Sequence, residues 1–323
     1  MAADLPAKAP AYAPPVAQNS WTWWVEGGAF STSDPAAGPF PLSLSPPVGI
    51  QPNIGGEGAI GFDSLLAAWP GYHISGQFRY GYAQRSGKTF PANIAVPSPP
   101  GVVFTTRTTS VFAKGAGSAD IKEHHWLVDI MIGRDFHLGS GDAQVKAGIR
   151  VADIYAKITG NGSVSGGDAP GGGGSPITGV FTFASRSKFL GVGPRFAVDG
   201  EIPLGGKAPQ RTLWSIDYGA GVAVLIGSRS LDSSSTLNLV LNPGAGPAFA
   251  TVSTALSSSS TGVVPNVDAQ LGVSYHFNSN SKITMSYRFD GYFGALRTLN
   301  SSGAIINEDV FYYGPMMRAT FSF

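Results

Sequence analysis

The residues best suited to acid–base chemistry are five histidines: His73, His124, His125, His137 and His276. His124 and His125 are adjacent, and neighbouring residues of a β-strand point to opposite faces, so these two side chains cannot bind one metal ion together. Asp129 shares a face with His125 in such a strand and would be the partner of a hydrolase-like site. Two polar residues on one face are more commonly a lumen lining. We therefore expect no catalytic residue, metal ion or cofactor, and keep a hydrolase centred on His125 as an alternative.

The glycine-rich segments do not form a nucleotide-binding motif. Residues 191–193 (GVG) lack the third glycine and the helix of a dinucleotide fingerprint, and residues 205–207 (GGK) read as a turn rather than a phosphate loop. The net charge of +1 lacks the basic excess of a nucleic-acid-binding surface. The chain has no cysteine, which excludes disulfides and thiolate metal sites.

Alternation of apolar and polar residues indicates β-strands, most clearly in residues 72–85 and 265–277. A period of two puts each set of side chains on one face. Several alternating segments are long enough to cross a membrane as tilted strands, which takes about 9–11 residues. No segment approaches the roughly 20 apolar residues of a spanning helix. Only a closed barrel lets strands cross lipid without unpaired backbone groups, so the pattern predicts a transmembrane β-barrel.

Aromatic residues near the segment ends support this prediction, because outer-membrane barrels carry aromatic girdles at both interfaces. They are Trp21, Trp23, Trp69, Tyr72, Tyr82, Trp126, Phe136, Trp214, Tyr275, Phe277, Phe293, Phe311 and Phe323. The connections also alternate in length. Long extracellular loops are expected at 31–53, 86–119, 159–185, 229–264 and 298–308, and short periplasmic turns at 64–71, 138–142, 200–209 and 278–281.

We predict an all-β, antiparallel, up-and-down barrel of about ten strands: 20–30, 54–63, 72–85, 120–137, 143–158, 186–199, 210–228, 265–277, 282–297 and 309–323. An even number leaves both termini in the periplasm. The loops 86–119 and 229–264 contain apolar residues, so each could hold an extra hairpin and give twelve strands, or could extend the strands above the membrane. Residues 161–175 are rich in Gly and Ser, and we expect them to be mobile.

Nearly all charged residues of the strands fall on the inward face. We assign to it Glu26, Glu57, Asp63, Asp129, Asp135, Asp199, Asp217, Asp268, Asp290, Arg79, Lys146, Arg150, Arg195, Lys282, Arg288 and Arg318. A cation facing lipid at mid-bilayer costs about 2–4 kcal/mol, which makes this placement close to forced. Arg134 and Asp153 face outward near strand ends, where a cation costs about 0–1 kcal/mol.

Ten of these inward residues are the predicted pore lining: Glu57, Arg79, Asp129, Lys146, Arg150, Arg195, Asp217, Asp268, Arg288 and Arg318. Side chains can fill a barrel of about 8 strands, whereas about 16–18 strands leave an aqueous channel. Ten strands lie nearer the filled end. Inward glycines are expected to leave room for a narrow channel: Gly61, Gly133, Gly148, Gly191, Gly193, Gly219, Gly221, Gly272 and Gly314.

The two ends of the chain carry different signals. Residues 1–6 (MAADLP) lack the basic and apolar regions of a signal peptide but look like the end of a small-residue cleavage site. We expect a secreted protein without its signal peptide, with a flexible periplasmic segment at 1–19 and the barrel at 20–323. At the other end, Phe321 and Phe323 close an alternating strand. A terminal aromatic resembles the sorting signal that is read by the outer-membrane assembly machinery.

Several segments carry a family resemblance. They are 128–136 (VDIMIGRDF), 147–155 (AGIRVADIY), 189–196 (FLGVGPRF), 220–227 (AGVAVLIG) and 313–323 (YGPMMRATFSF). They resemble strands of the pore-forming, Legionella-type major outer membrane protein family, from about residue 120 to the end. The first hairpin, 21–62, is only loosely similar, and the start at 3–6 (ADLP) is similar to that of small alphaproteobacterial outer-membrane proteins. The resemblance implies a pore and assigns no role to individual residues.

We therefore expect a porin-like protein of the bacterial outer membrane that passes ions or small hydrophilic solutes. The alternative is a closed structural or surface-interaction barrel that acts through its extracellular loops. The expected partners are outer-membrane lipid and lipopolysaccharide, the assembly machinery and small solutes, with no nucleic acid. The sequence leaves the solute, the ion preference and the oligomeric state open.

Overall fold

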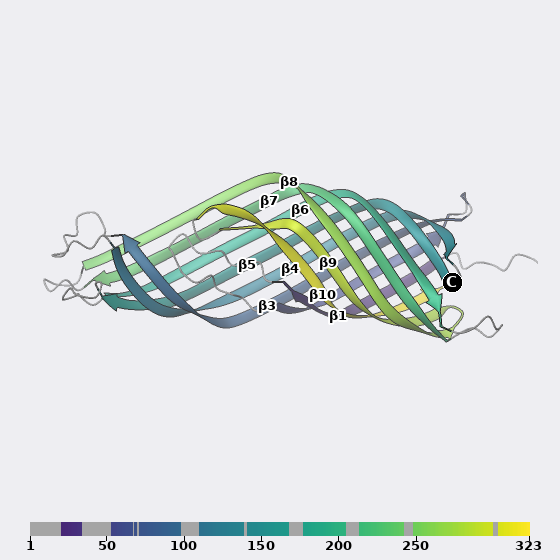
Figure 1. Ribbon diagram of the computed structural model, residues 1–323, viewed down its shortest axis with the longest axis horizontal. Helices are drawn as coiled ribbons and strands as arrows, with labels where there is room; N and C mark the ends of the chain where they lie inside the picture. Colours follow the sequence, from purple (N-terminus) through teal and green to yellow (C-terminus); the bar gives the residue numbers. More distant parts are fainter. Residues whose placement is uncertain are drawn as a thin grey trace, which may run out of the picture.

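Ten antiparallel strands form a closed barrel in the computed structural model, which describes residues 21–33, 53–66, 68–69, 71–97, 110–138, 141–167, 177–204, 213–241, 248–299 and 303–323. Within these residues the strands are β1 (Trp21–Thr32), β2 (Asn53–Leu65), β3 (Tyr72–Pro97), β4 (Ser110–Leu138), β5 (Gly141–Gly167), β6 (Ile177–Pro203), β7 (Trp214–Leu241), β8 (Ala248–Asn278), β9 (Ser281–Leu299) and β10 (Ile305–Ser322). Each pairs with its neighbours in the chain, and β1 pairs with β10 to close the ring (Figure 1). The predicted ten-stranded up-and-down barrel is confirmed.

The first and last described residues meet at one end of the barrel. The backbone N–H of Phe323 donates to the carbonyl of Trp21 at 2.8 Å, and the N–H of Trp21 donates back at 3.4 Å. The turn 279–280, which joins β8 to β9, lies at the same end. Short turns of outer-membrane barrels face the periplasm, so this end is periplasmic (Figure 1, where the C-terminus is marked). Residues 1–20, and with them the predicted N-terminal segment and cleavage site, lie outside the described residues.

The strands β3 to β8 are much longer than the other four. They contain 26 to 31 residues, whereas β1, β2, β9 and β10 contain 12 to 19. Crossing a bilayer takes only about 9–11 residues, so the six long strands continue on the extracellular side as a wall (Figure 1). We call this part the extracellular wall: residues 88–97, 110–119, 160–167, 177–183, 235–241 and 248–254.

The extracellular wall corrects part of the loop prediction. The predicted loops 86–119, 159–185 and 229–264 are largely paired strand, with Lys88 opposite Ala119 and Ser235 opposite Thr254. The segment expected to be mobile is strand β5 over residues 161–167, and its remainder lies outside the described residues. Gly, Ser and Thr are frequent in this part of the chain, and this composition looks like a loop, although inward side chains such as Phe181, Leu237 and Leu239 are buried. The apolar residues extend existing strands, so the twelve-strand alternative is wrong.

Apolar side chains form a belt on the outer surface of the membrane part. Ile130, Ile149 and Val192 on neighbouring strands are exposed there, as lipid-facing residues must be. A periplasmic girdle borders the belt, where Trp21 and Trp23 lie 6.2 Å apart and Trp23 lies 5.5 Å from Phe62 between ring centroids. The described residues contain no helix that is long and apolar enough to cross a membrane.

Candidate functional site in the barrel lumen

A central ion network crosses the lumen at mid-barrel: Glu26, Glu57, Arg79, Asp129, Arg150, Arg195, Asp268, Arg288 and Asp290. Alternation along each strand directs these side chains inward. On one side of the lumen, Arg288 of β9 donates to Glu26 of β1 at 2.5 Å and also to Glu57 of β2. Arg79 of β3 donates to Asp290 of β9 at 2.5 Å. These contacts join strands that are not neighbours in the ring, with one strand between β9 and β1 and three between β9 and β3, so the side chains reach across the lumen.

Arg150 is the centre of the other half of the network. Its Nε and Nη2 atoms donate to the two carboxylate oxygens of Asp129, both at 2.7 Å, and its Nη1 donates to Asn266 at 2.6 Å. Arg195 donates through both Nη atoms to the carboxylate of Asp268, and its Nε lies 3.4 Å from Asp129. Such paired, bidentate contacts are the arrangement in which a buried arginine is well compensated.

An apolar layer lies directly on the extracellular side of this network: Phe30, Leu127, Ile154, Phe189, Leu225, Val264, Tyr292 and Tyr312. All of them face inward and are 0–4% exposed. His125 lies in the same layer, with its ring 5.2 Å from that of Phe30 and 4.1 Å from that of Tyr312, and its Nε2 is 2.7 Å from Glu57. Inward side chains are therefore packed against one another at this level of the lumen.

Several inward glycines face large side chains rather than open space. A Cβ atom on Gly81 would collide with the ring of His125, one on Gly61 with Trp24, and one on Gly191 with Phe189. Among the glycines predicted to leave room, Gly221 faces Arg195 and Asp268 of the network. Gly219 lines the periplasmic cavity described next. At these positions neighbouring side chains occupy the space, whereas at Gly148, Gly193 and Gly314 an added Cβ atom would collide with the backbone of an adjacent strand.

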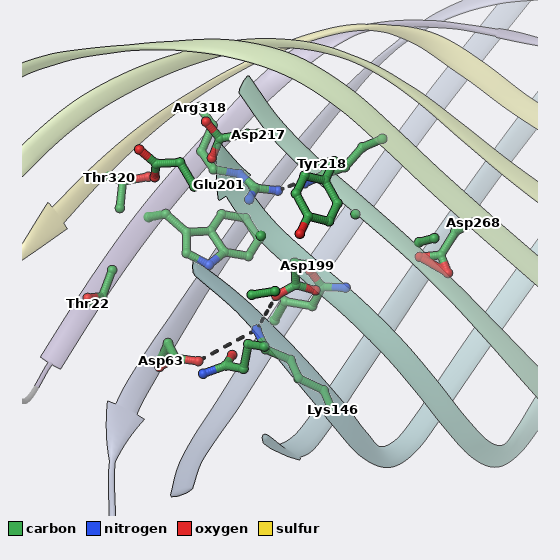
Figure 2. A pocket seen from close by; sticks show the side chains of 18 of the residues that line it. Thr22, Asp63, Lys146, Asp199, Glu201, Asp217, Tyr218, Asp268, Arg318 and Thr320 are labelled. Atoms are coloured by element: carbon green, nitrogen blue, oxygen red, sulfur yellow. Dashed lines mark hydrogen bonds and ion pairs between the residues drawn. The ribbon is translucent and has the colours of Figure 1, made fainter. Parts of the chain in front are cut away.

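A polar cavity of 430 Å³ occupies the periplasmic end of the lumen, and we call it the vestibule. Lys146 points to Asp199 at 2.6 Å and to Asp63 at 3.6 Å (Figure 2). Lys282 bridges Glu201 and Asp217, both at 2.6 Å. Arg195, Asp268 and Arg288 also line the vestibule, so the central ion network closes its inner end. The vestibule has charges of both signs, and its lysines are paired with carboxylates.

All ten residues of the predicted pore lining lie inside the barrel. Seven belong to the central ion network, and Lys146, Asp217 and Arg318 line the vestibule. Arg318 donates to Glu26 at 2.9 Å from its Nε. The apolar layer was not foreseen. Phe30 shares the inward face of β1 with Glu26, four residues away, and that register was the signal that could have identified it.

The outward exceptions and the histidine pair lie as the alternation predicts. Arg134 is over the ring of Tyr72 at 5.4 Å, and Asp153 pairs with Lys188 at 2.9 Å on the outer surface. His124 stacks on Tyr155 outside the barrel, whereas His125 faces inward. His125 is buried between the rings of Phe30 and Tyr312. The side chain of His137 lies outside the described residues.

Comparisons with solved structures return other outer-membrane barrels at very low identity. The outer membrane protease OmpT from Escherichia coli has 9% identity and a TM-score of 0.46, with 94% of this chain and 97% of that chain covered. The toluene transporter TodX of Pseudomonas putida has 6% identity and a TM-score of 0.24, with 95% and 90% covered. The β domain of the Bordetella autotransporter BrkA has 11% identity and a TM-score of 0.24, with 94% and 100% covered. These likenesses carry no argument about function.

Comparison at the level of sequence gives the family. No curated protein matches the chain. A family model, described as Legionella pneumophila major outer membrane protein precursor, matches residues 68–323, which include β3 to β10. The chain belongs to this family and is a β-barrel protein of the bacterial outer membrane.

Proposed function

We propose that this protein is a closed outer-membrane barrel that holds the extracellular wall at the cell surface and acts through contacts of that wall with other molecules. The burial of inward side chains at mid-barrel is the observation that carries the proposal. Arg150, Phe189 and Leu225 come from three adjacent strands and have no exposed surface, although all three point into the lumen. An open pore would need these side chains to line water.

Two successive barriers support a closed lumen. The central ion network pairs its five carboxylates with four arginines, and Arg318 of the vestibule also pairs with Glu26, so an ion entering the vestibule meets paired rather than free partners. The apolar layer beyond it has no polar path for a hydrated ion. Opening it would require a packed core to separate, and cores are close-packed and bistable rather than continuously deformable.

The form of the extracellular wall supports a role at the surface. Its strands stay paired to their described ends, with Leu241 opposite Ala248 and Pro97 opposite Ser110. Hydroxyl and amide side chains bridge its strands, such as Thr251 to Asn238 at 2.9 Å. A hydrogen-bonded sheet of this length presents a fixed polar surface well outside the bilayer. That surface suits recognition, because little conformational freedom is lost when a partner binds.

Trimming the extracellular wall tests this function. Residues 236–253 would be replaced by an Asn-Gly turn after Ser235, whose cross-strand partner is Thr254, and residues 161–182 by the same turn between Gly160 and Phe183. We expect cells that carry the full-length protein to adhere to each other or to surfaces more than cells without it, and cells that carry the trimmed protein to lose this gain. Surface levels and heat-modifiable migration should be unchanged. Unchanged adhesion with a folded, trimmed barrel would contradict the proposal.

A pore that opens on a signal is the second candidate. The observation in its favour is the charged character of the barrier at the inner end of the vestibule. Well-packed apolar residues often replace a buried ion network without loss of stability, so a charged network points to a role beyond stability. For this candidate, solute flux through wild-type protein must appear under some condition of voltage or pH in liposomes. Its absence under all of them favours the closed barrel.

A further inference from the structure

Three cations lie side by side on the outer surface of the barrel, and we call them the basic row: Lys122 of β4, Lys157 of β5 and Arg186 of β6. Lys122 is the cross-strand partner of Lys157, which is in turn the partner of Arg186. Lys122 and Arg186 are exposed and Lys157 is half-buried. Like charges directly opposite one another destabilise a sheet, so this arrangement favours an external anion.

The acids near the basic row are engaged elsewhere. Asp153 pairs with Lys188 at 2.9 Å and lies 4.0 Å from His124. Asp232 is the cross-strand partner of Arg186 but accepts a hydrogen bond from Ser257 at 2.7 Å. Asp120 accepts a hydrogen bond from the backbone of Gly87 at 3.0 Å. Among the described residues, none of these carboxylates forms an ion pair with the basic row.

The basic row lies at the level of the lipid headgroups. One step toward the membrane, His124, Tyr155 and Lys188 form the next row. The step after that contains Trp126 and Leu190, and beyond them Val128, Val151 and Val192 begin the apolar belt. Arg186 also lies 5.9 Å from the centroid of the Tyr155 ring. Aromatic rings mark the interface, so cations just above them meet the phosphates of the outer leaflet.

We propose that this face binds a phosphorylated, acylated glycolipid of the outer leaflet, a lipopolysaccharide. Its phosphates would contact the basic row and its acyl chains would lie on Leu190, Val151 and Val192. Lys and Arg are the usual partners of phosphate. The row extends over two interstrand steps of about 4.8 Å each, which suits a sugar headgroup with more than one phosphate better than a single phosphodiester. This inference does not depend on whether the lumen conducts.

The test is equilibrium binding of bisphosphorylated lipid A to refolded protein in detergent micelles, measured by surface plasmon resonance. Replacing two cations, Lys122→Gln with Lys157→Gln, should weaken binding by about 30-fold. The matched control, Lys114→Gln with Arg134→Gln, removes two outward cations that lie outside the basic row. This variant should bind lipid A like wild type. The pair Lys122→Arg with Lys157→Arg keeps both charges and should also bind like wild type. Heat-modifiable migration verifies folding of each variant.

Binding of other ligands distinguishes specific recognition of a bisphosphorylated glycolipid from general attraction to anions. Lipid A stripped of its phosphates, phosphatidylglycerol and inorganic phosphate should each bind the wild-type protein more weakly than bisphosphorylated lipid A. Equal binding of phosphatidylglycerol would overturn the proposal in favour of a general anionic-lipid surface. Equal binding of phosphate-free lipid A, or unchanged binding by the Lys122→Gln, Lys157→Gln variant, would overturn the role of the basic row.

Discussion

Arg150 and Asp129 form a two-point ion pair in the centre of the lumen, with both nitrogen–oxygen distances at 2.7 Å and no exposed surface on Arg150. The pair joins β4 to β5 and lies between the vestibule and the apolar layer. Arg195 of β6 extends it, because its Nε lies 3.4 Å from Asp129. The contacts of Asp129 with Arg150 and Arg195 join β4, β5 and β6, so we expect them to contribute to the stability of the barrel.

Removing the arginine alone should therefore destabilise the barrel strongly. Arg150→Met leaves Asp129 buried with weaker compensation, and we expect a loss of about 3–5 kcal/mol in the free energy of unfolding. Arg150→Met combined with Asp129→Leu should cost less than the single change. Urea titration in detergent micelles measures both. The control is Lys146→Met in the vestibule. The partner of Lys146, Asp199, is half exposed, so we expect a loss of less than about 1 kcal/mol in the free energy of unfolding. Equal losses in the single and double variants would contradict the ion-pair account.

Gly81 leaves space for the ring of His125, so adding a methyl group at this position should destabilise the barrel. Gly81→Ala pushes the ring away from its 2.7 Å contact with Glu57, and we expect a cost of about 1–3 kcal/mol in unfolding free energy. Gly27 is the matched control, since a Cβ atom there lies 3.8 Å from its nearest neighbour, the carbonyl oxygen of Glu57. Combining Gly81→Ala with His125→Ala should recover part of the loss. If the losses of unfolding free energy from the two changes simply add, Gly81 is not needed to accommodate the ring of His125.

Phe323 tests the predicted assembly signal. Its ring is 71% exposed on the outer surface, whereas its backbone closes the barrel against Trp21. Phe323→Ala keeps the backbone bonds and is therefore a cleaner change than deletion. We expect less protein in the outer membrane, with refolding in detergent and heat-modifiable migration unchanged. Phe277→Ala, at the periplasmic end of β8, is the comparison for loss of one girdle ring. Normal outer-membrane levels of Phe323→Ala would argue against a sorting signal.

Alternation in the sequence was sufficient for the ring of strands and for the inward direction of charges such as Glu57 and Arg288, because lipid imposes a strict two-residue period. It failed at the extracellular ends of β3 to β8, where frequent Gly, Ser and Thr look like loops although residues such as Phe181 and Leu237 continue the buried face. It also failed for the apolar layer. Leu225 points inward and Ile226 outward, yet the two are interchangeable by composition. A glycine such as Gly81 indicates in the sequence that space is left at its position, but the sequence does not show that the ring of His125 occupies this space.

Single-channel recording of the purified, refolded wild-type protein in planar lipid bilayers tests the closed lumen most directly. A known porin inserted into the same bilayers is the positive control. Since the central ion network and the apolar layer block the lumen in series, we predict no conductance steps above the lipid baseline at neutral pH and moderate voltage. Reproducible steps that scale with the amount of folded protein would contradict the closed barrel and favour the pore.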